Sequence, residues 1–115
     1  MRRAHRLRQR RDFAAAYRRG KQYRGDLIVL RAVRNDGPLT RFGFSVGRAV
    51  GNAVVRNRVK RRLREAARSL PVESGWDVVV NARQGAASAR YSELKDQLCE
   101  LLSKARLLKA PGEGP

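Results

Sequence analysis

An excess of positive charge is the feature that most constrains this chain. Its 115 residues include 27 Lys and Arg but only 10 Asp and Glu, which gives a formal net charge of +17. A compact domain this basic repels itself unless a polyanion neutralises the charge. Nucleic acid is the commonest polyanion that binds such a domain, and an anionic membrane surface is a rarer one.

The basic residues gather in two parts of the chain. Residues 1–24 hold ten Lys and Arg against one acid, Asp12, and residues 45–68 hold eight against one acid, Glu65. A surface that serves only solubility usually mixes both signs. Arg outnumbers Lys, and its guanidinium grips phosphate with a bidentate fork and stacks on bases, which suits structured RNA. The clustering therefore favours a polyanion-binding surface.

Length and composition fit one domain, expected over residues 1–109. Within it, residues 1–8 are expected to form a basic flexible arm, and the Pro- and Gly-rich residues 110–115 a disordered tail. A single cysteine, Cys99, rules out an intrachain disulfide and suits a reducing cytoplasm. Neither a membrane-spanning apolar run nor a signal peptide is seen. We expect a cytoplasmic protein without a membrane partner or an obligate protein partner.

Periodicity and turn signals predict an α+β fold. The expected elements are helix 10–19, strands 27–33 and 41–46, helix 52–70, strand 76–82 and helix 91–107. Gly20 should end the first helix, and the turn signal at 35–38 should join the first two strands as a hairpin. The order is α-β-β-α-β-α, with room for an extra short strand. It implies a single-domain, two-layer sandwich in which helices pack on a small mixed sheet.

The helix expected after Asn52 carries most of the second basic cluster. Its apolar positions fall in one narrow stripe formed by Val55, Val59, Leu63, Ala66 and Leu70. The opposite side carries Asn57, Lys60, Arg61, Arg64 and Arg68. Because only Glu65 offers a local partner, so many like charges destabilise an isolated helix. A row of phosphates would turn that repulsion into binding.

The run from Gly51 to Glu65, GNAVVRNRVKRRLRE, closely resembles the Arg-Asn-Arg signature of the bacterial ribonuclease P protein family. The preceding residues 44–46, Phe-Ser-Val, match the strand that leads into this signature. Further similarity to the family lies at Arg6-Leu7, Asp12-Phe13, Tyr17, Gly20 and residues 79–83, Val-Val-Asn-Ala-Arg. The resemblance covers nearly the whole chain except the tail.

The resemblance implies both a topology and two binding surfaces. The topology is an α+β sandwich, of a type also found in a ribosomal protein domain, with a left-handed β-α-β crossover that opposes the general rule. Residues implied to contact the catalytic RNA are Arg56, Asn57, Arg58, Lys60, Arg61, Arg64 and Arg68. Residues implied to line a cleft for the single-stranded 5′ leader of precursor tRNA are Phe13, Tyr17, Arg31 and Arg48. The chain departs from many relatives at Arg31, where an aromatic is common, and at Ala49, where a second basic residue is common.

No residue pattern suggests that the protein itself is catalytic. The chain has one histidine, His5, and its acids are scattered, without the spacing of a metal site or of a phosphate-binding loop. The resemblance agrees, since it implies that the RNA subunit hydrolyses precursor tRNA with Mg²⁺ bound mainly by RNA. The protein would then be the subunit of an endoribonuclease that leaves a 5′-phosphate on mature tRNA, with the catalytic RNA and precursor tRNA as its partners.

Two alternative functions are compatible with the composition. One is a ribosomal or other structured-RNA-binding protein without a nuclease role, and the other is a small DNA-binding module. The continuous signature across residues 51–65 favours ribonuclease P over both.

Overall fold

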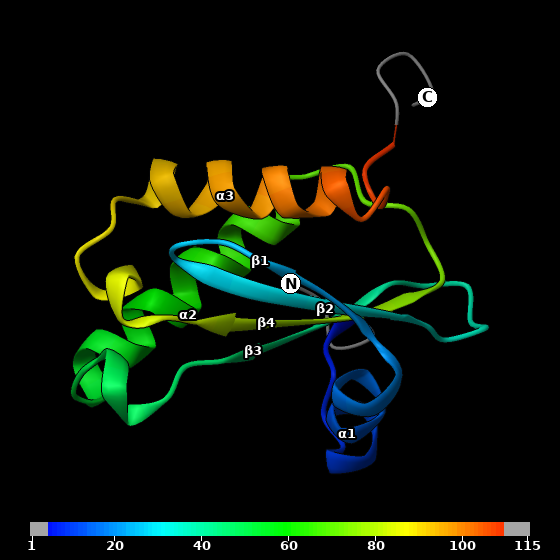
Figure 1. The fold of residues 1–115 in the computed structure, drawn as a ribbon, viewed down its shortest axis with the longest axis horizontal. Helices are drawn as coiled ribbons and strands as arrows, with labels where there is room; N and C mark the ends of the chain where they lie inside the picture. Colours follow the sequence, from blue (N-terminus) through cyan, green and yellow to red (C-terminus); the bar gives the residue numbers. More distant parts are fainter. Residues whose placement is uncertain (1–4, 110–115) are drawn as a thin grey trace.

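The computed structural model describes residues 5–109, which form three helices around one four-stranded sheet (Figure 1). In chain order the elements are α1 (Arg10–Arg19), β1 (Lys21–Arg24), β2 (Ile28–Arg34), β3 (Arg41–Ser45), η2 (Arg48–Val50), α2 (Ala53–Arg68), β4 (Trp76–Ala82), η3 (Gln84–Ala87) and α3 (Tyr91–Lys104), where η2 and η3 are short 3-10 helices. The α+β class and the order of elements are as predicted, and β1 is the extra short strand. No helix within the described part of the chain is long and apolar enough to span a membrane.

The sheet is mixed, with strand order β1-β2-β4-β3, and this order corrects the predicted hairpin. The predicted turn at 35–38 is present, and within it the Gly37 N–H donates to Asn35 Oδ1 at 2.7 Å. It connects β2 to β3, but these two strands do not pair with each other. β4 lies between them, antiparallel to β2 and parallel to β3. The physical reason is the apolar run Val78–Val80, which is fully buried and therefore belongs at the centre of the sheet. α2 supplies the long crossover that the parallel pair β3 and β4 requires, and the left hand of this crossover stays a prediction.

One face of the sheet is covered by α2 and α3, which lie side by side in Figure 1. The sheet contributes the buried side chains of Ile28, Leu30, Phe42, Val78 and Val80 to this main core. From the predicted stripe of α2, Val59, Leu63 and Ala66 are buried, while Val55 and Leu70 are half-buried at its ends. From α3, Leu94, Leu98, Leu101 and Leu102 are buried.

α1 packs on the opposite face and adds a partial third layer (Figure 1). Its Ala16 forms a second buried cluster with Leu7 and Val79. Leu7 belongs to the predicted flexible arm, yet it is buried and its N–H donates to the Phe42 carbonyl at 2.9 Å. Residues 1–4 of the arm and the predicted tail 110–115 lie outside the described residues. The buried cluster of Leu7, Ala16 and Val79 fixes the position of α1 on the sheet.

The helix ends follow local chemistry. Asn52 caps α2 as predicted, with its side-chain oxygen accepting from the Val55 N–H at 3.0 Å. Gly20 ends α1 in an extended conformation, and a Cβ there would lie 2.3 Å from the Ala16 carbonyl oxygen. α3 ends at Lys104, three residues before its predicted end, because Arg106 takes a φ of 60° and the chain turns there. This turn directs Leu107 into the main core.

Candidate functional site

The face of the sheet that α1 only partly covers, here the α1 face, carries polar side chains on three adjacent strands. Gln22 of β1 is in register with Arg31 of β2, and Arg31 is in register with Val79 of β4. Asn81 follows two residues later on β4, so it projects from the same face as Arg31. Arg31 and Asn81 interrupt the apolar runs of β2 and β4, and α1 adds Tyr17 beside them.

Four side chains of the α1 face, Gln22, Arg31, Asn81 and Tyr17, form one connected network, which we call the Arg31 network. Arg31 donates from Nη1 to Asn81 Oδ1 at 2.9 Å and from Nη2 to Gln22 Oε1 at 3.1 Å. Its guanidinium carbon lies 4.8 Å from the centre of the Tyr17 ring. The Tyr17 hydroxyl accepts from Asn81 Nδ2 at 2.7 Å. The network therefore ties α1 to three strands and fixes the orientation of Arg31.

The two aromatic residues of α1 have different environments. Tyr17 is 46 % exposed and stands beside Arg31, so the structure brings these two predicted leader residues together. Phe13 is half-buried and packs against the second cluster and β3. A Cβ on Gly43 would lie 2.5 Å from Phe13 Cζ, so the missing side chain at Gly43 makes room for this ring. Phe13 is thus mainly a packing residue, whereas Tyr17 offers an accessible ring.

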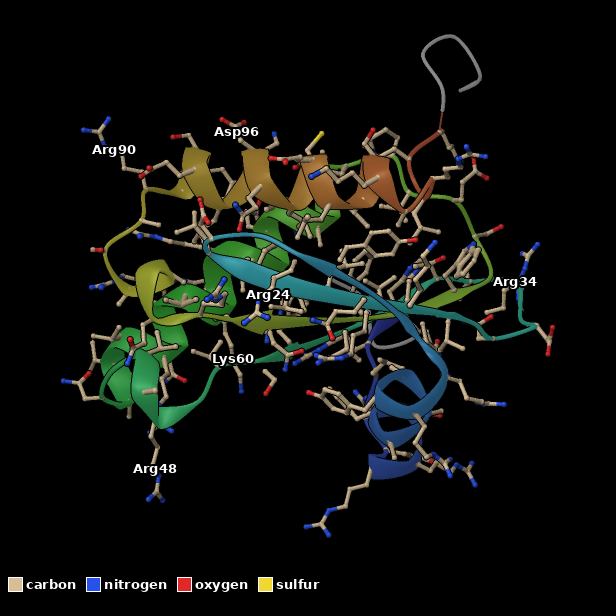
Figure 2. The ribbon with its side chains drawn as sticks, in the orientation of Figure 1. Arg24, Arg34, Arg48, Lys60, Arg90 and Asp96 are labelled. Atoms are coloured by element: carbon tan, nitrogen blue, oxygen red, sulfur yellow. The ribbon has the colours of Figure 1, made fainter. Side chains whose placement is uncertain are left out.

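Arg48, the fourth predicted leader residue, lies apart from the Arg31 network. It belongs to η2, after β3 has ended, and its side chain is exposed. In Figure 2 it points away from the ribbon, at the opposite end of the molecule from Arg34. The structure therefore joins two of the four predicted leader residues and leaves Arg48 on a separate protrusion.

The basic residues of α2 divide by what they contact. Asn57 and Arg61 are exposed, and Arg68 pairs with Glu65 at 2.7 Å on the helix surface. Arg58 instead donates to the Ala87 carbonyl at 3.1 Å. Arg62 likewise donates to the Ala89 carbonyl at 3.0 Å. These two arginines hold the segment between β4 and α3 against α2, a role that sequence periodicity did not reveal.

A basic hollow of about 220 Å³ separates α2 from the N-terminal segment. Its lining residues are Arg6, Leu7, Phe13, Phe42, Gly43, Phe44, Lys60 and Arg64. Burial, together with the charge of Arg6, lowers the pKa of Arg64 from its usual value. In the described part of the chain, the buried Nε atoms of Arg56, Arg58 and Arg64 have no hydrogen-bond partner. Binding of an anion would stabilise arginines that are partly buried and whose N–H donors lack partners.

The basic surface is open on the side of the molecule where α1 lies. In Figure 2, Lys60 extends from α2 past β3 toward that side. α3 mixes both signs of charge, because the exposed acids Glu93, Asp96 and Glu100 stand among basic residues such as Lys104, which pairs with Glu100. Figure 2 shows Asp96 directed away from α1. The excess of basic charge is therefore greater on α1 and α2, where the only acids are Asp12 and Glu65, than on α3.

An ion pair between the half-buried Arg41 and the buried Asp77, near the start of β3 and β4, serves the fold. Arg41 donates from Nε and Nη2 to the two oxygens of Asp77 at 2.9 and 2.7 Å. This bidentate contact raises the pKa of Arg41, and Asp12 of α1 approaches Arg41 Nη2 at 3.5 Å. Asn35 also donates to Asp77 at 2.9 Å. The pair satisfies the buried Asp77 and helps to seat α1, and it takes Arg41 out of the set of cations available to a ligand.

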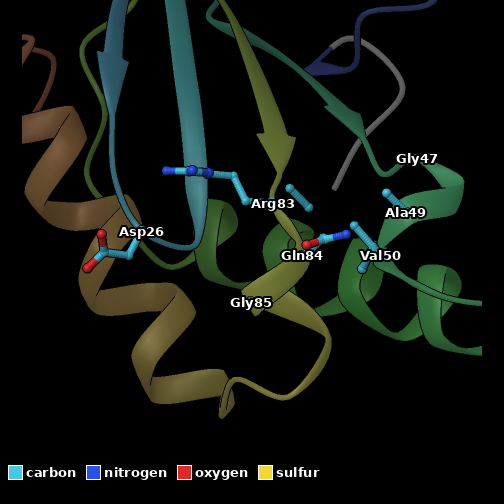
Figure 3. A pocket seen from close by; sticks show the side chains of 8 residues that line it. Asp26, Gly47, Ala49, Val50, Arg83, Gln84 and Gly85 are labelled. Carbon is cyan, nitrogen blue, oxygen red and sulfur yellow. The ribbon is translucent and has the colours of Figure 1, made fainter.

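A second hollow, of about 490 Å³, opens where β3 and β4 end (Figure 3). It is lined by Asp26, Gly47, Ala49, Val50, Ala82, Arg83, Gln84 and Gly85. Arg83 is already engaged, because its Nη1 donates to the Gly25 carbonyl at 2.9 Å. Within residues 5–109 no three His, Cys, Asp or Glu side chains come close enough together to hold a metal ion. Neither hollow thus presents the carboxylate or histidine cluster of a protein nuclease.

Sequence comparison identifies the chain's relatives. The family model for ribonuclease P matches residues 1–106. Among similar proteins, the ribonuclease P protein component of Dehalococcoides mccartyi strain 195 is 40 % identical over 113 residues, which span 98 % of this chain and 94 % of the relative. That of Symbiobacterium thermophilum is 42 % identical over 115 residues, which span 97 % of this chain and all of the relative.

Solved structures agree in fold. The ribonuclease P protein of Staphylococcus aureus superposes with a TM-score of 0.82 at 28 % identity, over 91 % of this chain and 98 % of that one. The Thermotoga maritima protein gives 0.77 at 31 % identity, over 86 % of this chain and 96 % of that one. The signature on α2 and the similarity over almost the full length agree with this fold. The chain belongs to the bacterial ribonuclease P protein family, the protein subunits of that endoribonuclease.

Proposed function

We propose that this subunit uses two separate surfaces to bring two RNAs together. The basic face of α2, comprising Arg56, Asn57, Arg58, Lys60, Arg61, Arg64 and Arg68, binds the catalytic RNA of ribonuclease P. The α1 face of the sheet, with Tyr17 and Arg31 at its centre, holds the single-stranded 5′ leader of precursor tRNA. Phe13, also on α1, supports this face by packing against β3. Arg48 extends the basic surface beyond the end of β3.

The observation that carries the proposal is the Arg31 network beside an exposed Tyr17 ring. Bases of a single strand are free to stack on aromatic side chains, and a neighbouring cation balances the phosphates. The sheet face is open beside Tyr17, whereas the other face is sealed by α2 and α3. The orphaned Nε donors of α2 lie on another element, which supports a second RNA contact rather than a longer leader site.

The chemistry of cleavage is assigned to the RNA subunit. Scattered carboxylates give the described residues no metal site, so the proposed Mg²⁺ is held mainly by RNA phosphates. The protein contributes by screening repulsion between the two RNAs and by holding the leader so that the scissile phosphate reaches those ions. Hydrolysis would remove the leader and leave mature tRNA with a 5′-phosphate. A cytoplasmic location, where tRNA precursors are made in bacteria, is part of the same proposal.

Leader-dependent affinity tests the proposal. Holoenzyme assembled from the full chain and the catalytic RNA is titrated with precursor tRNA and with mature tRNA, and the catalytic RNA alone serves as the control. The holoenzyme should bind the leader-bearing substrate more tightly than the mature one, and this difference should shrink when the protein is omitted. An equal preference with and without the protein would refute a leader-binding role. The alternative functions as a ribosomal or DNA-binding protein are not favoured, because the matching family and the similar proteins are those of ribonuclease P.

A further inference from the structure

Arg31 is held in place by neutral groups instead of an acid. It is half-buried on β2, and none of the ion pairs among the described residues includes it. Its partners are the amide oxygens of Asn81 and Gln22 and the ring of Tyr17. A surface arginine without an acid is ordinarily mobile, because ordering a long side chain costs conformational entropy. Three contacts that fix the guanidinium but leave its charge uncompensated suggest that it is aimed at a ligand.

The network presents hydrogen-bond donors outward. An arginine has five N–H donors, and Arg31 uses two of them on Asn81 and Gln22. The amide oxygens of Asn81 and Gln22 already accept from Arg31. The Tyr17 oxygen already accepts from Asn81, so the hydroxyl proton is left to donate. A ligand that meets this surface finds remaining Arg31 N–H groups and the Tyr17 O–H, and it must therefore offer acceptors.

Guanine is the base whose edge matches this arrangement. It presents two adjacent acceptors, O6 and N7, which an arginine fork can contact together, whereas adenine presents a donor, its N6 amino group, beside N7. In a single strand these edges are exposed and the base is free to stack on an aromatic ring. We infer that the Arg31 network reads one base of the leader and prefers guanine to adenine at that position. The inference rests on the proposed leader-binding function and gives it a specificity.

A phosphate group is the other ligand with adjacent acceptors, and it predicts a different result. Contacts to phosphate position a nucleic acid but carry no sequence information. The position of Arg31 favours the base: it lies on an inner strand of the sheet, and its guanidinium is held over the ring of the exposed Tyr17, so a base contacted by the arginine fork would lie next to an accessible aromatic side chain. A phosphate clamp would raise the affinity for all leaders alike.

Substrates that differ at single leader positions test the inference. Each position of the leader is made guanine or adenine in turn, and the affinity of reconstituted holoenzyme is measured for every pair. At one position guanine should bind roughly tenfold more tightly than adenine, the size expected for one bidentate arginine contact. Ratios that stay near one at every position would overturn the inference.

Variants connect that preference to the network. Arg31→Lys keeps the charge but lacks the fork, so the guanine-to-adenine ratio should fall to near one. Gln22→Met, on the exposed edge strand, removes one contact that orients Arg31 and should reduce the ratio without a large change in fold. Arg34→Lys is the matched control, because Arg34 ends the same strand and lies over Trp76, at 5.1 Å from its ring centre. It should leave the ratio unchanged, and circular dichroism checks that every variant is folded.

The outcomes separate the inference from the function on which it rests. If holoenzyme gains no affinity from a leader, the proposed function fails. If it gains affinity without base preference, or with a preference that survives Arg31→Lys, then only the inference fails and Arg31 acts as a phosphate clamp or does not touch the leader.

Discussion

At the scale of single residues, neighbours in space decide which side chains are available for binding. Phe13 and Tyr17 are four residues apart on α1, and from the sequence they are equivalent. In the structure, the Phe13 ring packs in the space left by the missing side chain of Gly43, whereas Tyr17 contacts Asn81 and Arg31. Asn81 could have been noticed as a polar interruption of an apolar strand. Its bond to Arg31 spans 50 positions of the chain and has no local signal.

Replacing Tyr17 tests the leader surface directly. Tyr17→Leu keeps much of the apolar volume but removes the ring, so holoenzyme should lose about 1–3 kcal/mol of affinity for precursor tRNA, the worth of one stacked base. Affinity for mature tRNA and for the catalytic RNA should change little. Tyr17→Phe keeps the ring and should recover most of the loss, as measured by equilibrium binding. Equal weakening for precursor and mature tRNA would show that the leader lies elsewhere.

Replacing Gly43 tests the packing role of Phe13. Because a Cβ at this position would fall 2.5 Å from the Phe13 ring and 3.1 Å from Leu7, Gly43→Ala should destabilise the protein by about 1–3 kcal/mol through overpacking. Gly47→Ala is the control, since a Cβ there meets nothing within 4 Å. Denaturant unfolding measures both variants. A Gly43→Ala protein as stable as the control would mean that Phe13 is free to move and is not a packing residue.

At the scale of elements, local signals were read correctly and strand pairing was not. Helix 10–19 and strand 76–82 match α1 and β4, and the N-cap at Asn52 follows from its side chain. The predicted hairpin of strands 27–33 and 41–46, which are β2 and β3, was wrong. Proximity in the sequence does not reveal that the apolar run Val78–Val80 of β4 takes the central place between them. The family resemblance implied that Arg58 contacts RNA like the other signature residues of α2, although Arg58 is bonded to the chain after β4.

The binding of RNA by α2 should be visible in its salt dependence. We expect Lys60→Ala with Arg61→Ala to weaken binding to the catalytic RNA. The log–log slope of affinity against salt should fall by about 0.7–0.9 for each phosphate that the variant no longer neutralises. Neither side chain bonds to the loop that Arg58 and Arg62 hold, so the fold should survive.

Lys104→Ala, on α3 beside Glu100, is the control for this double variant and should leave the slope unchanged. A folded double variant with the slope of the unmodified protein would place the RNA on another surface.

At the scale of the whole molecule, the excess of basic charge is concentrated on α1 and α2. The acids Glu93, Asp96 and Glu100 are exposed on α3, where basic residues such as Lys104 stand among them. Composition predicted the polyanion, and the signature predicted the family. The arrangement of the helices needed the fold, because the sequence does not show that α2 and α3 cover one face of the sheet and α1 the other. The protein is thus built to bind and position RNA, while its carboxylates form no metal site among residues 5–109.

The most direct test of this account is cleavage of precursor tRNA with each component left out in turn. Purified protein, catalytic RNA, precursor tRNA and Mg²⁺ are combined at low Mg²⁺ and near-physiological salt, and the 5′ end of the product is mapped. We expect removal of the leader to give a 5′-phosphate when all are present, no cleavage by the protein alone, and slower cleavage without the protein. Site-specific cleavage by RNA-free protein that persists through further purification, or a rate unaffected by the protein, would contradict this account.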